Sequence, residues 1–332
     1  MYQSTTISIA CPNIAFIKYW GNVDHYLRIP SNGSISMNLG GLYSRTRVTF
    51  SSELNADQFI LNKQHKIGAP LLRVTSHLDR VRQLAGIHFF ARVESHNNFP
   101  TGSGLASSAS GFAALTLAAC QAVGLALEES DLSRLARIAS GSACRSVPGG
   151  FVEWQVGQDD LTSFAYSIAP PDYWDLVDCI SVVSRVQKPI SSYDGHLLAE
   201  SSPLQSVRVM DAPRRLEDCR RAIQERDFST LANIVELDSN MMHSVMMTSS
   251  PPLIYWKPST LEVMREVTEW RNEGLPVCYT VDAGPNVHVL TLSSYADQVA
   301  HRLNQIPGVL EVSSASPGGP AHCLSNAEPL IL

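Results

Sequence analysis

Residues Asn97–Gly111 read NNFPTGSGLASSASG, and this stretch is the most informative in the chain. A loop rich in glycine and serine leads directly into the alanine-rich segment Phe112–Val123, which the pattern predicts as a buried helix. Glycines let backbone N–H groups approach an anion closely, and a helix N-terminus has unpaired N–H donors and the positive end of the helix dipole. Ser107 and Ser108 add hydroxyls that can bind a phosphate oxygen or a magnesium ion. The stretch therefore predicts a nucleotide phosphate loop.

Taken alone, this stretch leaves a second interpretation open, because glycine- and serine-rich loops before helices are also common N-caps. The usual P-loop is excluded, since no Gly-Lys-Ser/Thr ending follows the glycines. A dinucleotide-binding fingerprint is excluded as well, because Gly102, Gly104 and Gly111 have the wrong spacing for it. Motifs elsewhere in the chain must decide between a cap and a phosphate site.

Length and charge limit the classes of function. The chain has 332 residues, 44% of them hydrophobic, which is enough for a large core and indicates two domains or lobes. The formal net charge is −6, from 25 Lys and Arg against 31 Asp and Glu, so no broad basic field exists and we expect no nucleic-acid partner. A phosphorylated small molecule would be held by a few local cations and backbone donors.

Cysteine usage and hydropathy indicate a cytoplasmic protein. The seven cysteines are scattered and never form C-x-x-C, which argues against disulfides and zinc and for a reducing compartment. The N-terminus MYQSTTISIACP lacks the basic flank and apolar region of a signal peptide. The apolar run 112–127 is too short and too interrupted to span a membrane, so we expect no membrane association.

The pattern of elements predicts an α+β protein with two lobes, residues 1–172 and 173–332. Alternating or apolar runs predict strands over Thr5–Ala10, Ile14–Tyr19, Ser34–Leu39, Thr46–Phe50, Asp57–Asn62, His88–Ser95, Val177–Ser184, Val277–Val281 and Val287–Leu292. Helical spacing predicts further helices over Pro70–Ala85, Leu132–Ser140, Arg215–Arg226, Leu231–Met246, Ser259–Glu273 and Ala296–Ile306. In the helix 259–273, Ser259 is expected as the N-cap and Glu262 as its capping-box partner.

Three more motifs carry chemistry. Lys18 is a lone charge inside the apolar part of NIAFIKYWGNVD (Asn13–Asp24), so it needs either an anion or an exposed strand end, where a lysine can snorkel. Ser140–Ser146 combines serines with Arg145, which can bind phosphate or carboxylate, although a helix C-cap with an incidental arginine is the simpler alternative. Asp282 ends an apolar strand before Gly284 and Pro285; it is either a turn residue or a carboxylate that projects into a cleft.

Together these motifs resemble the mevalonate diphosphate decarboxylase family of the GHMP kinase superfamily. Ala10–Gly21 resembles the family segment NIAxxKYWG, Asn97–Gly111 its ATP loop, and Ser140–Gly150 its segment SGSxxRSxxGG. Lys188–Gly195 resembles the loop KxxSSxxG, Phe228–Met247 resembles a family helix, and Thr280–Asn286 resembles the turn TxDAGPN. The resemblance covers nearly the whole chain.

The resemblance implies a fold and a reaction. The expected fold has a ribosomal protein S5 domain 2-like N-terminal lobe and an α/β sandwich C-terminal lobe, with the site between them. The implied enzyme is an ATP- and Mg²⁺-dependent decarboxylase of isoprenoid biosynthesis. It phosphorylates the 3-hydroxyl of a 5-phosphorylated mevalonate, and then loses phosphate and CO2. The family is commonly homodimeric, so we expect a homodimer.

The resemblance also assigns residues. Asp282, Lys18 and Arg145 would be catalytic: Asp282 orients or deprotonates the hydroxyl, Lys18 stabilises the reacting region, and Arg145 holds the carboxylate and neighbouring phosphate. Residues expected to bind ATP are Ser95, Asn97, Pro100, Gly102, Ser103, Gly104, Leu105, Ala106, Ser107 and Ser108, of which Ser107 and Ser108 would also contact Mg²⁺ held by ATP. Residues expected to bind the substrate are Tyr19, Asn22, Ser140, Ser142, Arg145, Ser192 and Tyr193.

Two departures from the family pattern fall on the substrate phosphate end. The diphosphate enzymes typically have Lys after KYWG, where this chain has Asn22, and several bacterial members have Arg where it has Tyr193. Two cations are missing and Asp194 adds a negative charge, so a diphosphate should bind less favourably. We therefore expect mevalonate 5-phosphate as substrate and isopentenyl phosphate as product. The alternatives are mevalonate 5-diphosphate, with Arg28 or Lys188 compensating, and a mevalonate 3-kinase that does not decarboxylate.

Overall fold

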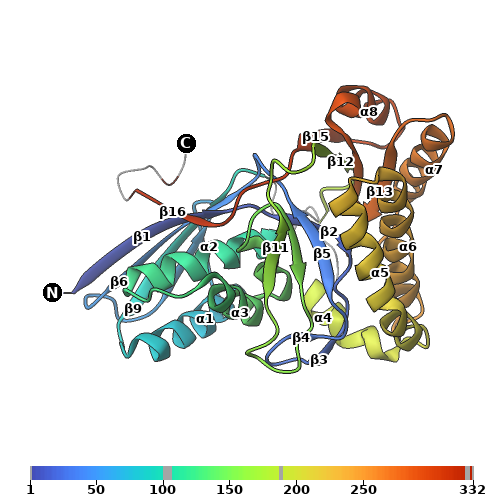
Figure 1. The fold of residues 1–332 in the computed structure, drawn as a ribbon. Coiled ribbons are helices and arrows are strands. Elements are labelled where there is room, and N and C mark those ends of the chain that lie inside the picture. The colour runs from blue at the N-terminus through green and yellow to red at the C-terminus, as the bar shows by residue number, and fades with distance from the viewer. Residues whose placement is uncertain (1, 100–106, 187–189, 326–329, 331–332) are drawn as a thin grey trace.

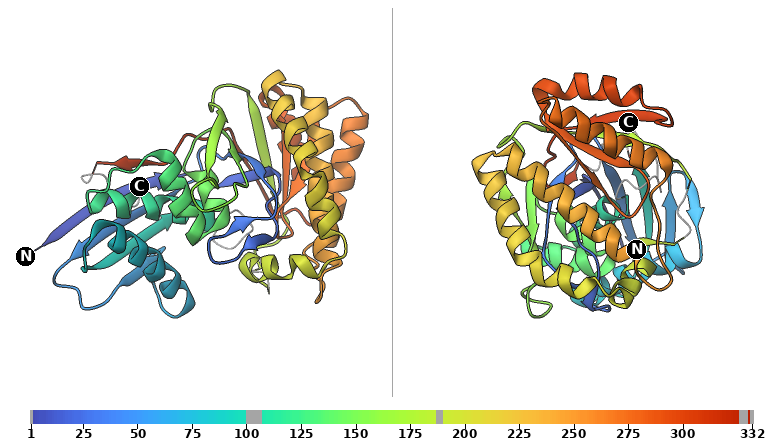
Figure 2. Two further views of the ribbon diagram at one scale, coloured as in Figure 1. Left: turned by 60° about the horizontal axis from the view of Figure 1, so that its bottom comes forward. Right: turned by 90° about the vertical axis from the view of Figure 1, so that its right-hand side faces the viewer.

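The computed structural model describes residues 2–99, 107–186, 190–325 and 330. Two lobes lie side by side (Figure 1): sheets with helices α1–α3 form one, and helices α5–α8 with their own sheet form the other. Figure 2 shows the same two lobes from two further directions. The α+β class expected from the sequence is confirmed.

The elements follow the chain in a mixed order. The strands are β1 (Gln3–Ala10), β2 (Asn13–Ile17), β3 (Asn22–Asp24), β4 (Ile29–Pro30), β5 (Ser34–Asn38), β6 (Ser44–Ser51), β7 (Gln58–Leu61), β8 (Gln64–Lys66), β9 (Phe90–Asn97), β10 (Phe151–Trp154), β11 (Ala165–Ala169), β12 (Leu176–Val182), β13 (Val277–Val281), β14 (Val287–Leu292), β15 (Glu311–Ala315) and β16 (His322–Leu324). The α-helices are α1 (Ala69–Ala85), α2 (Ser107–Ala122), α3 (Glu129–Ala139), α4 (Ser192–Leu198), α5 (Gln205–Glu225), α6 (Phe228–Met247), α7 (Pro258–Asn272) and α8 (Ala296–Asn304). Three short 3-10 helices are η1 (Gly141–Ser146), η2 (Ala199–Ser201) and η3 (Ser293–Tyr295).

The N-terminal lobe is built on a sheet with the strand order β16-β1-β6-β9-β7-β8. Helix α2 packs on β1, β6 and β9, where its buried alanines share a cluster with Val48, Phe50 and Val93. Small side chains let the helix approach the sheet closely, and the Ser8 hydroxyl donates a hydrogen bond of 2.5 Å to the carbonyl of Ala114. The alanine-rich segment is therefore a core helix, as its composition predicts, and its N-terminus is fixed by the sheet beneath it.

One hydrophobic core joins the two lobes. The sheet β11-β10-β5-β2 and the sheet β13-β14-β12-β15 share this core with helices α5 and α6. Ile14, Phe16 and Met37 from the first sheet are fully buried in it together with Ile180 and Leu290 from the second. Helices α7 and α8 cover the other face of the C-terminal sheet. Packing therefore holds β2 and β13 in place, since residues of both strands belong to this core.

The C-terminal segment crosses back to the N-terminal lobe. After β15, the chain runs past Asn38 and Val147 and then adds β16 beside β1 (Figure 1). The amide of Gly318 donates to the carbonyl of Asn38 at 2.8 Å, and the amide of Ala321 donates to the carbonyl of Val147 at 3.0 Å. The division into residues 1–172 and 173–332 remains a prediction, but β16 belongs to the sheet of the first lobe.

Most helices begin earlier than the sequence predicts, and the physical reason is visible at α5 and α7. Helix α5 begins at Gln205 rather than Arg215 and continues through Pro213; Arg208 before the proline and Arg215 after it both pair with Asp238 of α6, which anchors both halves of the helix. Helix α7 begins at Pro258, with Lys257 as its N-cap and Thr260 as the capping partner, so the prediction of Ser259 and Glu262 was wrong. Proline is favoured at the first helical position, which moves the start forward.

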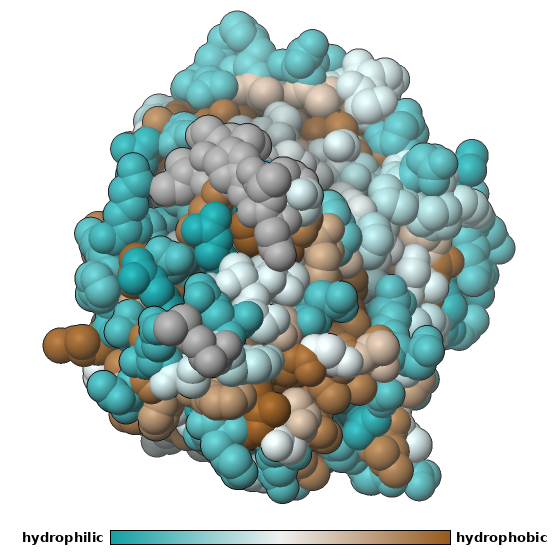
Figure 3. Space-filling model, turned by 90° about the vertical axis from the view of Figure 1, so that its left-hand side faces the viewer, coloured by the Kyte–Doolittle hydropathy of each residue, from teal (hydrophilic) through white to brown (hydrophobic). Residues whose placement is uncertain are grey.

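The surface is mixed in character. Figure 3 shows one face of the molecule, where hydrophilic side chains alternate with smaller hydrophobic areas, most of them in the lower half of the view. Among the helices that the structure describes, none is long and apolar enough to cross a membrane.

A glycine in the crossing region gives a test of this architecture. A Cβ on Gly149 would lie 2.5 Å from the backbone nitrogen of Pro320, whereas a Cβ on Gly319 would meet nothing within 4 Å. Gly149→Ala should destabilise the protein by about 1–3 kcal/mol, because backbone must move to make room. Gly319→Ala, the matched control, should leave stability unchanged or raise it by about 0.4–1 kcal/mol. Chemical denaturation measures both, and equal stability of the two variants would contradict the close packing of this segment.

Candidate active site

A buried ion pair joins the two lobes. Lys18 follows β2 and Asp282 follows β13, and the Lys18 Nζ atom donates to the Asp282 Oδ1 atom at 2.6 Å. The Lys18 side chain is 2% exposed and that of Asp282 is 29% exposed, so Asp282 forms the open side of the pair. The anion that a buried lysine requires is therefore Asp282, which is 264 residues away in the sequence.

The surroundings keep Asp282 ionised. Burial acts to raise the pKa of its carboxyl, but the ammonium of Lys18, together with His288 and Arg145, outweighs this effect and holds the pKa below its ordinary value. A carboxylate that stays charged at neutral pH accepts hydrogen bonds strongly. It is a good group for orienting a hydroxyl and a weak one for taking its proton before the hydroxyl reacts.

Arg145 is buried close to this pair. It lies in η1, is 3% exposed, and donates to the hydroxyls of Ser34 and Ser36 at 2.6 and 3.1 Å and to the Asn13 Oδ1 atom at 3.1 Å. Each of these partners is a neutral oxygen, so the guanidinium charge is oriented but not neutralised by them. Burial lowers the pKa of Arg145, and Asp282 acts to raise it. A buried guanidinium in this state favours an anionic ligand.

The residues predicted for the substrate phosphate lie along two neighbouring loops. The Tyr19 hydroxyl donates to the Asn22 Oδ1 atom at 2.5 Å, and Asn22 is only 3% exposed. The Tyr19 ring lies against Gly141, where a Cβ would be 2.5 Å from it. Ser140 is buried, and its hydroxyl lies 3.4 Å from that of Ser108. The position where family members carry lysine is thus filled by a neutral side chain in a neutral hydrogen bond.

The second departure from the family pattern has a cationic neighbour. Tyr193, in the first turn of α4 next to Ser192, is 47% exposed, and the guanidinium carbon of Arg28 lies 4.9 Å from the centre of its ring. Asp194 accepts a hydrogen bond of 2.6 Å from the hydroxyl of Ser191, the N-cap of this helix. Arg28 therefore brings a positive charge next to Tyr193, the position at which arginine is expected from the family pattern.

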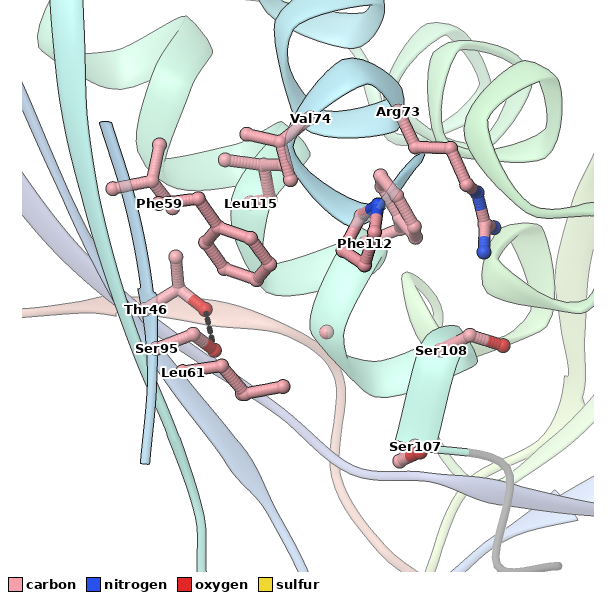
Figure 4. Close-up of a pocket in the computed structure, with 13 residues that line it drawn as sticks. Thr46, Phe59, Leu61, Arg73, Val74, Ser95, Ser107, Ser108, Phe112 and Leu115 are labelled. Atoms are coloured by element: carbon pink, nitrogen blue, oxygen red, sulfur yellow. Dashed lines mark hydrogen bonds between the residues drawn. The ribbon is translucent and has the colours of Figure 1, made fainter. Parts of the chain in front are cut away.

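A cavity of about 180 Å³ opens beside the start of α2. Its walls are largely apolar, and Figure 4 shows Phe59, Val74 and Leu115 around one end and Ser107 and Ser108 at the other. On the side formed by β6 and β9, the hydroxyls of Thr46 and Ser95 are hydrogen-bonded at 2.9 Å. An apolar cavity next to a helix N-terminus suits a planar base linked to phosphates.

The predicted ATP residues divide into three groups. Ser95, Ser107 and Ser108 line the cavity. Asn97 does not line it, and its side-chain oxygen accepts a hydrogen bond of 2.7 Å from the hydroxyl of Ser44. Pro100, Gly102, Ser103, Gly104, Leu105 and Ala106 lie outside the described residues.

Sequence reasoning missed the walls of this cavity. Phe59, Leu61, Arg73, Phe112 and Leu115 line it, but they read as ordinary strand and helix positions. The helical stripe of α1 and the apolar face of α2 were available signals, and both were interpreted as core.

In the described part of the chain, no group of three or more His, Cys, Asp or Glu residues could hold a metal ion. The serine hydroxyls at the start of α2 are oxygen ligands of the kind that Mg²⁺ accepts alongside phosphates. Their contact with Mg²⁺ remains a prediction.

Family models match both halves of the chain. Residues 10–165 match a model described as diphosphomevalonate decarboxylase-like N-terminal domain, and residues 179–319 match a mevalonate 5-diphosphate decarboxylase C-terminal domain. The diphosphomevalonate decarboxylase of Aspergillus fumigatus is 37% identical over 330 residues, which cover 93% of this chain and 81% of the relative. That of Homo sapiens is 37% identical over 304 residues, covering 84% of this chain and 75% of the relative.

Solved structures of the same kind share the fold. Mevalonate diphosphate decarboxylase from Staphylococcus aureus has a TM-score of 0.92 and 37% identity, with 97% of this chain and 98% of that chain covered. A structure described as MDDEF in complex with MVAPP, AMPPCP and magnesium also has a TM-score of 0.92 and 37% identity, with 97% of this chain and 99% of that chain covered.

The ion pair predicts a shift in the titration of Asp282. In Lys18→Met the ammonium that opposes the effect of burial is gone, so the pKa of Asp282 should rise. The carboxylate then becomes protonated at a higher pH as the pH falls. Carbon-13 NMR of labelled aspartate carboxyls measures this, with the Asp282 signal assigned by its loss in Asp282→Asn. Lys257→Met is the control, since Lys257 binds Ser184; an unchanged Asp282 titration in Lys18→Met would refute the assignment.

Proposed function

This chain belongs to the diphosphomevalonate decarboxylase family, and on that premise we propose that it converts mevalonate 5-diphosphate, ATP-dependently, into isopentenyl diphosphate, phosphate, CO2 and ADP. The observation that carries the proposal is the pair of Lys18 and Asp282 beside the buried guanidinium of Arg145. This arrangement offers one carboxylate for a hydroxyl and two cations for the negative charges of the substrate. Those are the groups that the reaction needs.

The chemistry assigns a task to each side chain. Asp282 accepts a hydrogen bond from the 3-hydroxyl and directs its oxygen at the γ-phosphorus of ATP, and its lowered pKa favours this orienting role. The new O–P bond makes the tertiary oxygen a leaving group. As the C–O bond breaks, the electrons of the C–C bond to the carboxylate form the alkene and CO2 departs. Arg145 holds that carboxylate, and Lys18 stabilises negative charge on the oxygen.

The nucleotide fits the cavity at the start of α2. The base would lie among the apolar walls, and the phosphates would meet the helix N-terminus and the hydroxyls of Ser107 and Ser108. Mg²⁺, when bound with ATP, neutralises part of the phosphate charge.

The choice of the diphosphate revises the expectation drawn from the sequence. That expectation placed mevalonate 5-phosphate first, whereas the relatives described above are diphosphate enzymes and support the alternative better. Arg28 beside Tyr193 supports the same alternative, because it supplies a cation where the family arginine is missing. The monophosphate remains a second candidate on one observation: Asn22 is buried, neutral and already bonded to Tyr19.

The location and assembly of the protein are separate proposals. We propose the cytoplasm from the cysteine usage and the homodimer from the family, and sedimentation of the purified protein tests the second. The homologous structures concern mevalonate diphosphate decarboxylases, and a place in isoprenoid biosynthesis follows from that reaction.

The test of the reaction is the release of ADP and CO2 from both substrates. We expect one CO2 for each ADP and a higher kcat/KM on the diphosphate than on the monophosphate. Asp282→Asn should lower kcat by about 10²–10⁴-fold with KM little changed, because the carboxylate acts mainly in the transition state. ADP without CO2 would instead identify a mevalonate 3-kinase, and preference for the monophosphate would establish the second candidate.

A pair of substitutions tests the phosphate end. Asn22→Lys and Tyr193→Arg restore the two family cations, and each should raise kcat/KM on the diphosphate relative to the monophosphate by about tenfold, which equals about 1.4 kcal/mol. Asn304→Lys, which adds the same charge on the exposed helix α8, is the control. If neither variant changes the ratio, these positions do not contact the terminal phosphate.

A further inference from the structure

The backbone around Lys18 lies outside the β-sheets and so lacks the hydrogen bonds that pair neighbouring strands. Residues 18–21, between β2 and β3, belong to no strand, so their backbone groups need other partners. Side chains from α4, α5 and α6 provide them: Asp238 accepts from the Lys18 amide (2.6 Å), Arg208 donates to the Lys18 carbonyl (2.7 Å), Gln205 donates to the Trp20 carbonyl (2.9 Å), and His196 accepts from the Gly21 amide (3.0 Å). The loop that carries Lys18 is thus held by the opposite lobe.

The strongest of these contacts come from buried charges. Asp238 and Arg215 are fully buried and Arg208 is 1% exposed. The Oδ2 atom of Asp238 binds the Lys18 amide and its Oδ1 atom binds the Arg215 Nε atom at 2.8 Å, so both carboxylate oxygens are used. Asn32 adds a second donor to the Lys18 carbonyl at 2.9 Å. The peptide groups on both sides of Lys18 are therefore fixed by charged or amide side chains.

We propose that Asp238 and Arg208 are positioning residues for the decarboxylation: they form hydrogen bonds with the amide and the carbonyl of Lys18 and so hold its ammonium against Asp282. The inference rests on the proposed function. Among the described residues, neither forms a hydrogen bond or an ion pair with Asp282, so each acts through Lys18.

Stability alone does not account for this cluster. Replacing a buried ion pair by hydrophobic side chains of similar volume is often neutral or stabilising, so such clusters are weak devices for stability. Holding a reacting group in place is a different matter, because a displacement of about 1 Å can lower a rate about 10²-fold. A shift of the Lys18 backbone would be carried along its side chain to the ammonium, and the contacts to the Lys18 amide and carbonyl prevent that shift.

The chain contains a matched control for this arrangement. Asp57, in the N-terminal lobe, is like Asp238 in binding both an arginine and a backbone amide: it accepts two hydrogen bonds from Arg82, at 2.9 and 3.0 Å, and one from the amide of Ala91, at 2.8 Å. It is buried like Asp238 but makes no contact with the loop of residues 18–21. Loss of the charge at Asp57 should therefore affect stability and not chemistry.

The experiment compares Asp238→Asn with Asp57→Asn in the full-length protein. In Asp238→Asn we expect kcat to fall about 10²-fold with the KM for ATP unchanged. The acidic limb of the pH profile of kcat should move to higher pH, because a displaced Lys18 no longer holds Asp282 ionised. In Asp57→Asn the melting temperature should fall while kcat per folded molecule and the pH profile stay as in the wild type.

Other results would overturn the inference. A folded Asp238→Asn protein with the kcat and pH profile of the wild type would show that the cluster is merely structural. If Asp238→Asn does not fold, Arg208→Lys takes its place. Lysine keeps the positive charge but cannot bind the Asn32 side chain and the Lys18 carbonyl at once, as the two guanidinium nitrogens of Arg208 do. This variant must lower kcat and move the acidic limb to higher pH, as expected for Asp238→Asn. If the wild type turns over neither substrate, the proposed function fails, and NMR titration of Asp282 in the same variants still decides whether Asp238 positions Lys18.

Discussion

The contact between Lys18 and Asp282 is the constraint on which the rest of the structure depends. A lysine that is 2% exposed must have an anion, and the only described carboxylate within ion-pair distance of it comes from the other lobe. The two lobes must therefore meet with the C-terminal ends of β2 and β13 next to each other. The shared hydrophobic core and the returning C-terminal segment make that arrangement rigid.

This constraint also explains where charge is left available. Lys18 is balanced by Asp282, and Asp238 is balanced by Arg215 and Arg208. Arg145 instead has neutral oxygens as its described side-chain partners, and Arg28 has the face of an aromatic ring. A protein with a net charge of −6 can bind an anionic substrate in this way, because Arg145 and Arg28 are local cations with no carboxylate among the described ion pairs.

The phosphate end of the site is where this chain departs from its family. Asn22 and Tyr193 replace cations, yet the stacking of Arg28 on Tyr193 brings one cation back. Two cations of the family pattern are absent and Arg28 returns one beside Tyr193, which leaves a balance of charge that is less positive than the family pattern. This balance is why the residues alone favour one substrate and their arrangement with the comparisons favours the other.

The sequence by itself determined the α+β class, most strands and the core helices, and it predicted Lys18, Asp282 and Arg145 as the reacting residues, because these depend on local periodicity and on short motifs. It could not determine that α5 starts ten residues early, that β16 joins β1, or that Phe59 and Leu61 face a cavity. Each of these rests on contacts between residues far apart in the chain, which no local pattern records. Only the tertiary structure decided that Lys18 meets Asp282 and that Asp238 and Arg208 grip its backbone, since packing of the two lobes brings those atoms together.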